Sequence, residues 1–181
     1  MTPFHLQTIA LIQSIEDCLE KKRILPALAL IYTGLDVMAS LQRRGDEGVR
    51  EAFTRWVDNY LLKARSLPCT ALELFAARCG VLHTFTADSD LFHRGKVRRV
   101  LYAWGTAKAS DLAATISKLG RDDGVAIHVE DLFWAFREGL ADYVDVVDQS
   151  PDLRNRFAQG TDLWFTELGL ATIEQFLNLP R

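Results

Sequence analysis

The stretch from Ile24 to Leu41 limits the possible folds most strongly, because it is almost entirely apolar and about long enough to cross a membrane. It also contains Pro26 near its start, Gly34, and Asp36 in its second half. A charged residue within a bilayer is costly, whereas the centre of a soluble helical bundle can pair it with a partner. We therefore expect a buried central helix and no membrane span.

The segments around this stretch place apolar residues at helical spacing. Several amphipathic helices joined by short links favour a helical bundle. We expect Gly45 to end the second helix and Asp46 to cap the third, with Val49 on the apolar face of the third. The four predicted helices are Pro3 to Glu20, about Leu25 to Arg44, Asp46 to about Leu61, and the stretch from Thr70 to Asp88.

The second half of the chain mixes strand and helix patterns. The segment from Ser89 to Lys96 is a polar loop or a short helix. Two segments favour strands that pair with each other, through their β-branched and aromatic content or strict alternation, although the first also fits a helix. The predicted elements are strands at Val97–Trp104 and Val125–Val129, a helix from Ser110 to Gly120 capped by Ser110, and helices at Glu130 to about Val147, Asp152–Phe165 with a break near Gly160, and Leu168–Leu179.

Size and composition narrow the class of protein. With 181 residues and 49% hydrophobic content, we expect one mostly α domain over residues 1–181, with a bundle core at about 3–88 and a small two-stranded β element and C-terminal helices over 89–181. The net charge of −3 means that any phosphate binding depends on local patches. Cys18, Cys69 and Cys79 lack metal-ligand spacing and predict reduced thiols, and no signal peptide is evident. We expect a cytoplasmic protein without metal or cofactor.

The fourth predicted helix carries the most informative residues. Thr70 and Glu73 form a capping box, and the helix then continues through Arg78 and His83. An Arg in an apolar turn needs a partner, and a His is the side chain that titrates near neutral pH. Residues five apart are about 140° out of phase on an ideal helix, so they share a face only if the backbone deforms, for which Gly80 offers a place. The plain alternative is that Arg78 pairs with a carboxylate elsewhere, while His83 is hydrogen-bonded near the helix end.

This Arg-x4-His pair, late in a helix of a small helical protein, resembles the signature of the HEPN superfamily. The resemblance covers about Leu6 to Trp104 in helix pattern, and Arg78 and His83 in motif. It implies a metal-independent ribonuclease or toxin, or an inactive relative, that usually dimerises with its motifs facing each other. Family members often carry a polar residue directly after the Arg, and Cys79 occupies that position here.

We therefore expect a metal-independent endoribonuclease, as a toxin or defence effector, with RNA and a cognate antitoxin protein as partners. Arg78 would hold the scissile phosphate, His83 would transfer protons, and Asp36 would support them, or form a structural ion pair between helices. Because of the angular offset, we expect a homodimer whose sites take Arg78 from one chain and His83 from the other. The alternatives are a non-catalytic helical dimer that binds RNA or a partner protein, and a structural scaffold.

A basic run follows the motif and offers a second candidate for RNA contact. Its cations could neutralise phosphates despite the negative total charge, or they could form a solvated loop. Cys79 has the character of a small buried filler and His128 that of a surface histidine. Phosphate-cradling glycine loops, nucleophile elbows and paired-cysteine zinc motifs are absent from the sequence. The predicted RNA-binding residues are Arg94, Lys96, Arg98 and Arg99.

Overall fold

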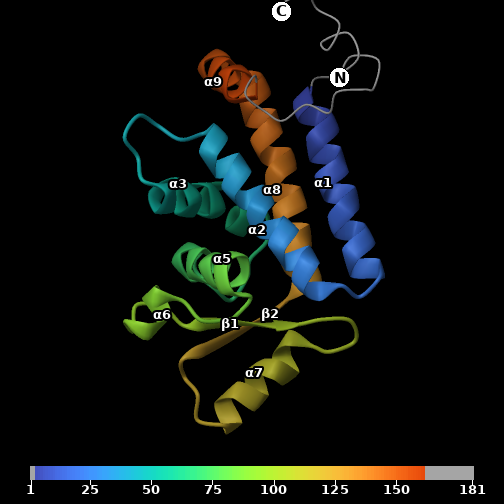
Figure 1. The fold of residues 1–181 in the computed structure, drawn as a ribbon, viewed down its shortest axis with the longest axis vertical. Helices are drawn as coiled ribbons and strands as arrows, with labels where there is room; N and C mark the ends of the chain where they lie inside the picture. Colours follow the sequence, from blue (N-terminus) through green and yellow to red (C-terminus); the bar gives the residue numbers. More distant parts are fainter. Residues whose placement is uncertain (1–2, 162–181) are drawn as a thin grey trace, which may run out of the picture.

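The computed structural model describes residues 3–161 and has a mostly helical fold with a small two-stranded sheet, as the sequence predicts (Figure 1). The predicted helix at Leu168–Leu179 and the last residues of the one at Asp152–Phe165 lie outside this part of the chain. The elements are α1 (Pro3–Glu20), α2 (Ile24–Leu41), α3 (Val49–Trp56), a π-helical turn (Val57–Leu61), α4 (Leu62–Ala64), α5 (Ala71–Thr84), α6 (Asp90–His93), β1 (Arg99–Ala103), α7 (Ala109–Lys118), β2 (Gly124–His128), α8 (Val129–Gln149) and α9 (Pro151–Thr161).

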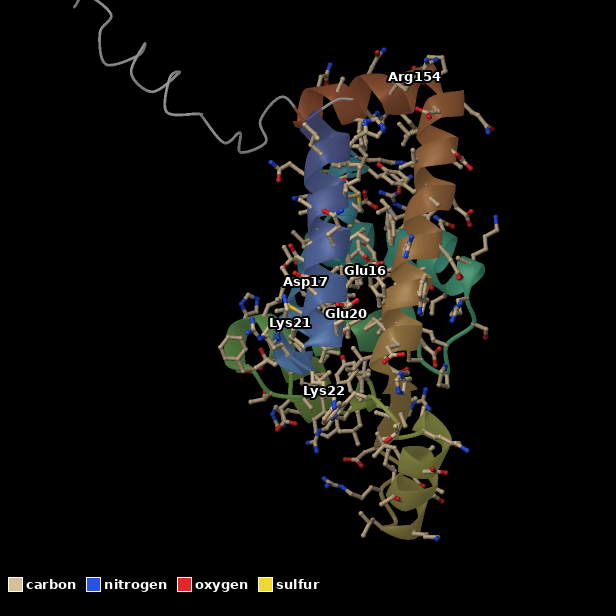
Figure 2. The ribbon with its side chains drawn as sticks, turned by 90° about the vertical axis from the view of Figure 1, so that its right-hand side faces the viewer. Glu16, Asp17, Glu20, Lys21, Lys22 and Arg154 are labelled. Carbon is tan, nitrogen blue, oxygen red and sulfur yellow. The ribbon has the colours of Figure 1, made fainter. Side chains whose placement is uncertain are left out.

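The long helices α1, α2 and α8 pack along one another, and α9 lies across one end of α1 and α8 (Figures 1 and 2). Ile31, Leu35 and Met38 of α2 are buried in the core. Helix α2 is apolar and long enough to span a membrane, and half of it is buried within the protein. Glu16, on the side of α1 toward α8 in Figure 2, pairs with Arg137 of α8 at 2.9 Å.

The turn between α2 and α3 differs from the prediction. Helix α2 ends at its C-cap Gln42, before Gly45 is reached, and Gly48 is the N-cap of α3 without any side-chain cap. Asp46 therefore caps nothing, and Val49 is 51% exposed instead of facing the core. Gly45 has a φ of +42°, so it serves the turn itself and not the helix end.

A polar network accounts for this shift. The side-chain amide of Gln42, buried against α3, donates to the Tyr60 hydroxyl at 3.1 Å and accepts from Arg55 at 2.9 Å. Arg55 also donates to both carboxylate oxygens of Glu47 at 2.8 Å. Hydrogen bonding to Arg55 lowers the pKa of Glu47 to about 2. Tertiary pairing thus fixes the turn where local capping signals point to other positions.

The predicted third helix is interrupted by its close contact with α8. A π-helical turn at Val57–Leu61 separates α3 from the short α4. Gly139 of α8 faces this turn, and a Cβ there would lie 2.8 Å from the carbonyl carbon of Tyr60. Only a glycine permits this approach, because backbone atoms cannot yield as a flexible side chain does.

The β element is a parallel β–α–β unit. Strands β1 and β2 pair in register from Arg99 with Gly124 to Ala103 with His128, and α7 connects them. A parallel pair requires such a crossover. Compared with the prediction, β1 begins two residues later and ends one residue earlier. Lys108, not Ser110, is the N-cap of α7.

Helix α8 follows β2 directly and therefore ties the β–α–β unit to the bundle. Val129, predicted to end the second strand, is the first residue of α8 and is fully buried. His128 is its N-cap, and Nδ1 of His128 accepts from the Glu130 amide at 3.3 Å. This histidine thus has a capping role that the sequence did not indicate, at a partly exposed position. At the other end of the chain, α9 passes through Gly160 without the expected break.

Candidate functional site

The capping box at the start of α5 is confirmed. The Thr70 amide donates to Glu73 Oε2 at 2.8 Å, and the Glu73 amide donates to Thr70 Oγ1 at 3.2 Å. Glu73 is 5% exposed and also accepts from the guanidinium of Arg98 at 2.7 Å. The start of α5 is therefore fixed both by its own cap and by the chain that enters β1.

Arg78 of α5 pairs with Asp36 of α2, as the structural alternative predicts. Nε of Arg78 lies 2.6 Å from Asp36 Oδ2, and the two side chains are 18% and 21% exposed. Burial alone would lower the pKa of Arg78, but hydrogen bonding to Asp36 outweighs it and raises that pKa. The guanidinium is therefore a fixed positive charge held by α2.

One carboxylate oxygen of Asp36 takes no part in the contact with Arg78. Both nitrogens of Arg78 that reach this carboxylate contact Oδ2, and Oδ1 is buried without a hydrogen-bond partner within residues 3–161. A buried unsatisfied acceptor is unusual and concentrates at functional sites or strained ones. The same oxygen leaves Asp36 able to accept another donor without losing Arg78.

Arg78 and His83 contact each other within one chain. Nη1 of Arg78 lies 3.4 Å from Nε2 of His83. Helix α5 is regular α-helix from Ala71 to Thr84, so the long arginine side chain, and not a backbone deformation at Gly80, spans the angular offset. Because a guanidinium only donates, Nε2 is the acceptor in this contact. The angular offset on an ideal helix therefore does not keep the two groups apart within one chain.

Gly80 has a different role from the one expected. A Cβ at this position would lie 2.5 Å from the carbonyl oxygen of Thr86 and 2.6 Å from that of Asp88. The chain therefore returns directly over α5 after the helix ends. The reversal occurs at Phe85, which caps the helix in the left-handed region with φ 53° and ψ 33°.

This reversal creates a groove of about 630 Å³ between α5 and the returning segment. His83 and Cys79 line it from α5, and Asp88, Asp90 and His93 line it from the return. Cys79 is half-buried, and its sulfur lies 3.8 Å from Arg78 Nη1, so it is a wall of the groove and not a core filler. His83 is exposed.

The basic run is divided between structural and free cations. Arg98 is bound to Glu73, and Arg99 is bound to Asp88 at 2.7 Å while its guanidinium lies 4.1 Å from the Phe92 ring centre. Arg94 and Lys96 are exposed, and their side chains have no charged partner in the part of the chain that the structure describes. Of the four predicted RNA-binding residues, these two are accessible for phosphate.

His93, directly before the basic run in sequence, lines the same groove as His83, which the sequence spacing does not indicate. The usable signal was Ser89, whose hydroxyl accepts from the Phe92 amide at 3.3 Å and so starts α6. A helix that begins after only five intervening residues beyond the end of α5 implies a tight return, but the sequence does not show toward which face. Within residues 3–161, no group of three or more His, Cys, Asp or Glu side chains is arranged to hold a metal ion.

Comparison with protein families, curated proteins and solved structures finds no match for this chain. The chemistry of the site therefore has to be judged from its geometry. The site combines a fixed guanidinium, an imidazole whose Nε2 is an acceptor, and an open groove beside them. Such groups can bind an anion and move a proton.

Proposed function

We propose that this chain is a metal-independent endoribonuclease that cleaves RNA at the Arg78–His83 pair. The observation that carries the proposal is the 3.4 Å contact between Arg78 Nη1 and His83 Nε2 beside the groove. A phosphodiester in this groove meets His83 in its wall, and Arg78, which contacts both His83 and Cys79 of that wall, is the donor that we propose for the phosphate oxygens. Asp36 supports the site by fixing Arg78.

The reaction that these groups support is an internal transfer. His83 takes the proton from the ribose 2′-hydroxyl, the 2′-oxygen attacks phosphorus, and the bond to the 5′-oxygen breaks. The guanidinium of Arg78 stabilises the charge that develops on the phosphate oxygens. The products are a 2′,3′-cyclic phosphate and a 5′-hydroxyl, and no water is consumed in this step.

The wider setting is part of the same proposal. A toxin or defence effector acting in the cytoplasm as a homodimer, with a cognate antitoxin protein as partner, is supported by the HEPN resemblance of the Arg-x4-His pair. Arg94 and Lys96, which are exposed, supply accessible cations for binding RNA.

A non-catalytic helical dimer is the second candidate, and a specific observation favours it. The charge of Arg78 is already matched by Asp36, and the carboxylates of Asp88 and Asp90 line the groove and repel phosphate. On this alternative, Arg78 and His83 contribute to packing only. Their replacement would then change stability without changing any RNA chemistry.

The test incubates the purified chain with single-stranded RNA in EDTA and identifies the ends of the products. The proposal expects cleavage with 2′,3′-cyclic phosphate ends that His83→Ala and Arg78→Ala each reduce by about 10²-fold or more. His128→Asn is the matched control, because it removes a histidine but keeps a side chain that caps α8. Products with 5′-phosphate ends, a requirement for magnesium, or full activity of His83→Ala would contradict the proposal.

A further inference from the structure

The groove beside Arg78 contains a second imidazole. His93, at the end of α6, lines the same groove as His83 of α5, although the two are ten positions apart in sequence. The chain reversal at Phe85 and the close passage over Gly80 bring them to one site. Other histidines of the chain do not line this groove: His128 caps α8, and His5 belongs to α1.

The contact with Arg78 leaves one role in the reaction unfilled. Because a guanidinium only donates, Nε2 of His83 carries no proton in this contact, and it can take the 2′-hydroxyl proton when Arg78 Nη1 turns from it to the phosphate. The 5′-oxygen that leaves phosphorus needs a proton at the same time. Arg78 stays charged and cannot supply it, so another group at the groove has to do so.

We propose that His93 is the general acid of this site, an inference that rests on the proposed ribonuclease function. His93 gives its proton to the departing 5′-oxygen, while His83 receives the proton of the 2′-hydroxyl. One bond forms between the 2′-oxygen and phosphorus, and one breaks between phosphorus and the 5′-oxygen. Both imidazoles return to their starting forms by proton exchange with water, so the atoms and charges balance.

Neighbouring charges fit this division of roles. Nε2 of His93 lies 3.9 Å from Oδ2 of Asp88, so His93 faces an anion, whereas His83 faces the cation of Arg78. Asp88 is itself held by Arg99, whose Nη2 lies 2.7 Å from Oδ1. This support orients the carboxylate independently of any bound RNA. His93 is 62% exposed, so it is free to contact a substrate.

His93 also indicates the direction of the RNA strand. It also lines a second groove, together with Lys96 and Arg98. A residue shared by both grooves lies between them. The nucleotide that carries the leaving 5′-oxygen therefore continues past His93 toward Lys96, and the attacking ribose lies near His83.

The test compares two RNA substrates that differ only in the leaving atom. One has the natural 5′-oxygen, and the other has a 5′-bridging sulfur, which leaves as a thiolate and needs no proton. His93→Gln is expected to slow cleavage of the natural RNA by about 10²- to 10⁴-fold and to retain nearly the wild-type rate on the sulfur substrate. His83→Gln is expected to slow both substrates, because the 2′-hydroxyl is the same in each.

Three outcomes would overturn the inference. Unchanged cleavage of natural RNA by His93→Gln means that His93 has no role, and equal losses on both substrates mean that it only positions other groups. Wild-type protein that cleaves neither RNA overturns the proposed function, and the role of His93 falls with it. Since the exposed His93 side chain contacts Asp88 and the edge of the neighbouring Phe92 ring, thermal unfolding of His93→Gln should lie close to the wild type, which shows that any loss of cleavage is chemical.

Discussion

Glu73 binds Arg98 across 25 positions of sequence, and in doing so it joins the start of the motif helix to the entry of β1. Oε1 accepts from Arg98 Nε at 2.7 Å and Oε2 accepts from Nη2 at 3.1 Å, while Arg98 also donates to the Pro68 carbonyl at 3.2 Å. The same carboxylate closes the capping box with Thr70. A local helix signal and a tertiary ion pair thus depend on one side chain.

Replacing Glu73 by Gln is expected to lower the free energy of unfolding by about 1.5–3 kcal/mol, the range for hydrogen bonds to charged groups. The loss is large because Glu73 is buried and serves two partners at once. Urea unfolding at neutral pH measures it. Glu51→Gln is the matched control, since the pair of Glu51 with Arg50 is exposed and should contribute little to stability. Equal effects of the two substitutions would contradict the assignment.

The same variant has a defined pH dependence. Burial alone would raise the pKa of Glu73, but the hydrogen bonds from Arg98 and Thr70 outweigh it, so the pKa lies below the ordinary value of 4.5. A carboxyl with a lowered folded pKa stabilises the protein above its unfolded pKa, and this stabilisation is lost as the pH falls through the folded value. The stability gap between wild type and Glu73→Gln should therefore be constant at neutral pH and narrow below the ordinary pKa. A stability difference that grows as the pH falls would contradict the lowered pKa of Glu73.

Phe85 offers a stabilising substitution. It lies in the left-handed region with its ring 70% exposed, so the backbone is strained while the side chain gains little from burial. Left-handed geometry costs an L-residue about 1–2 kcal/mol, and glycine avoids this cost. Glycine also makes the unfolded chain more flexible, which offsets part of the gain in stability. Phe85→Gly should raise the free energy of unfolding by about 0.5–1 kcal/mol. Phe85→Ala, which keeps the Cβ, should leave it within about 0.5 kcal/mol, and an equal gain in both would point to the ring instead.

Gly80→Ala should be destabilising, although alanine favours helices over glycine by about 1 kcal/mol in an open position. The added Cβ would lie 2.5 Å from the Thr86 carbonyl oxygen, so the returning segment has to move away from α5. Thermal unfolding should show a lower melting temperature, and RNA cleavage should fall because the groove is displaced. Cys79→Ala is the control on the same helix. A more stable Gly80→Ala would show that the segment yields easily.

Much of the bundle follows from local signals, whereas the site does not. Neighbouring residues are sufficient to predict the capping box at Thr70, the bounds of α1 and the apolar face of α2, and the structure confirms all three. The turn after α2 is held by Arg55, which binds both Glu47 and Gln42. Rules for helix capping consider only neighbouring residues, so they do not predict these contacts.

The candidate site depends on distances that no sequence spacing reveals. A five-residue separation suggests opposite faces, yet an arginine side chain is long enough to reach His83 around the helix. Likewise, the placement of His83 and His93 on one groove arises from the path of the chain after Phe85. Asp36 could be matched with Arg78 from the sequence because a buried charge on α2 requires a partner.

The basic run should separate into two kinds of residue when RNA binding is measured against salt. The double variant Arg94→Ala with Lys96→Ala removes two accessible cations. The slope of the logarithm of the binding constant against the logarithm of the salt concentration should become shallower by about 1.4, or about 0.7 for each lost single-strand contact. Arg98→Ala breaks the pair with Glu73, so it should reduce stability instead and leave the slope nearly unchanged. Melting temperatures recorded for each variant separate the two effects. A shallower salt dependence of RNA binding for Arg98→Ala, in a fully folded protein, would show that Arg98 contacts RNA phosphates.

Mixing inactive subunits decides whether each site is built within one chain. The contact between Arg78 Nη1 and His83 Nε2 occurs inside a single chain, so each subunit carries its own pair even if the protein is a homodimer. Arg78→Ala and His83→Ala are each expected to be inactive, and their mixture should stay inactive after subunits exchange. A composite site would behave differently, because in a mixed dimer one site loses both residues and the other keeps both. Exchange is followed with two fluorescent labels, and a co-folded dimer of wild type with the double variant serves as the positive control. Recovery of activity in the mixture would show that Arg78 serves the partner's His83, and that the contact within the chain is exchanged for one across the interface.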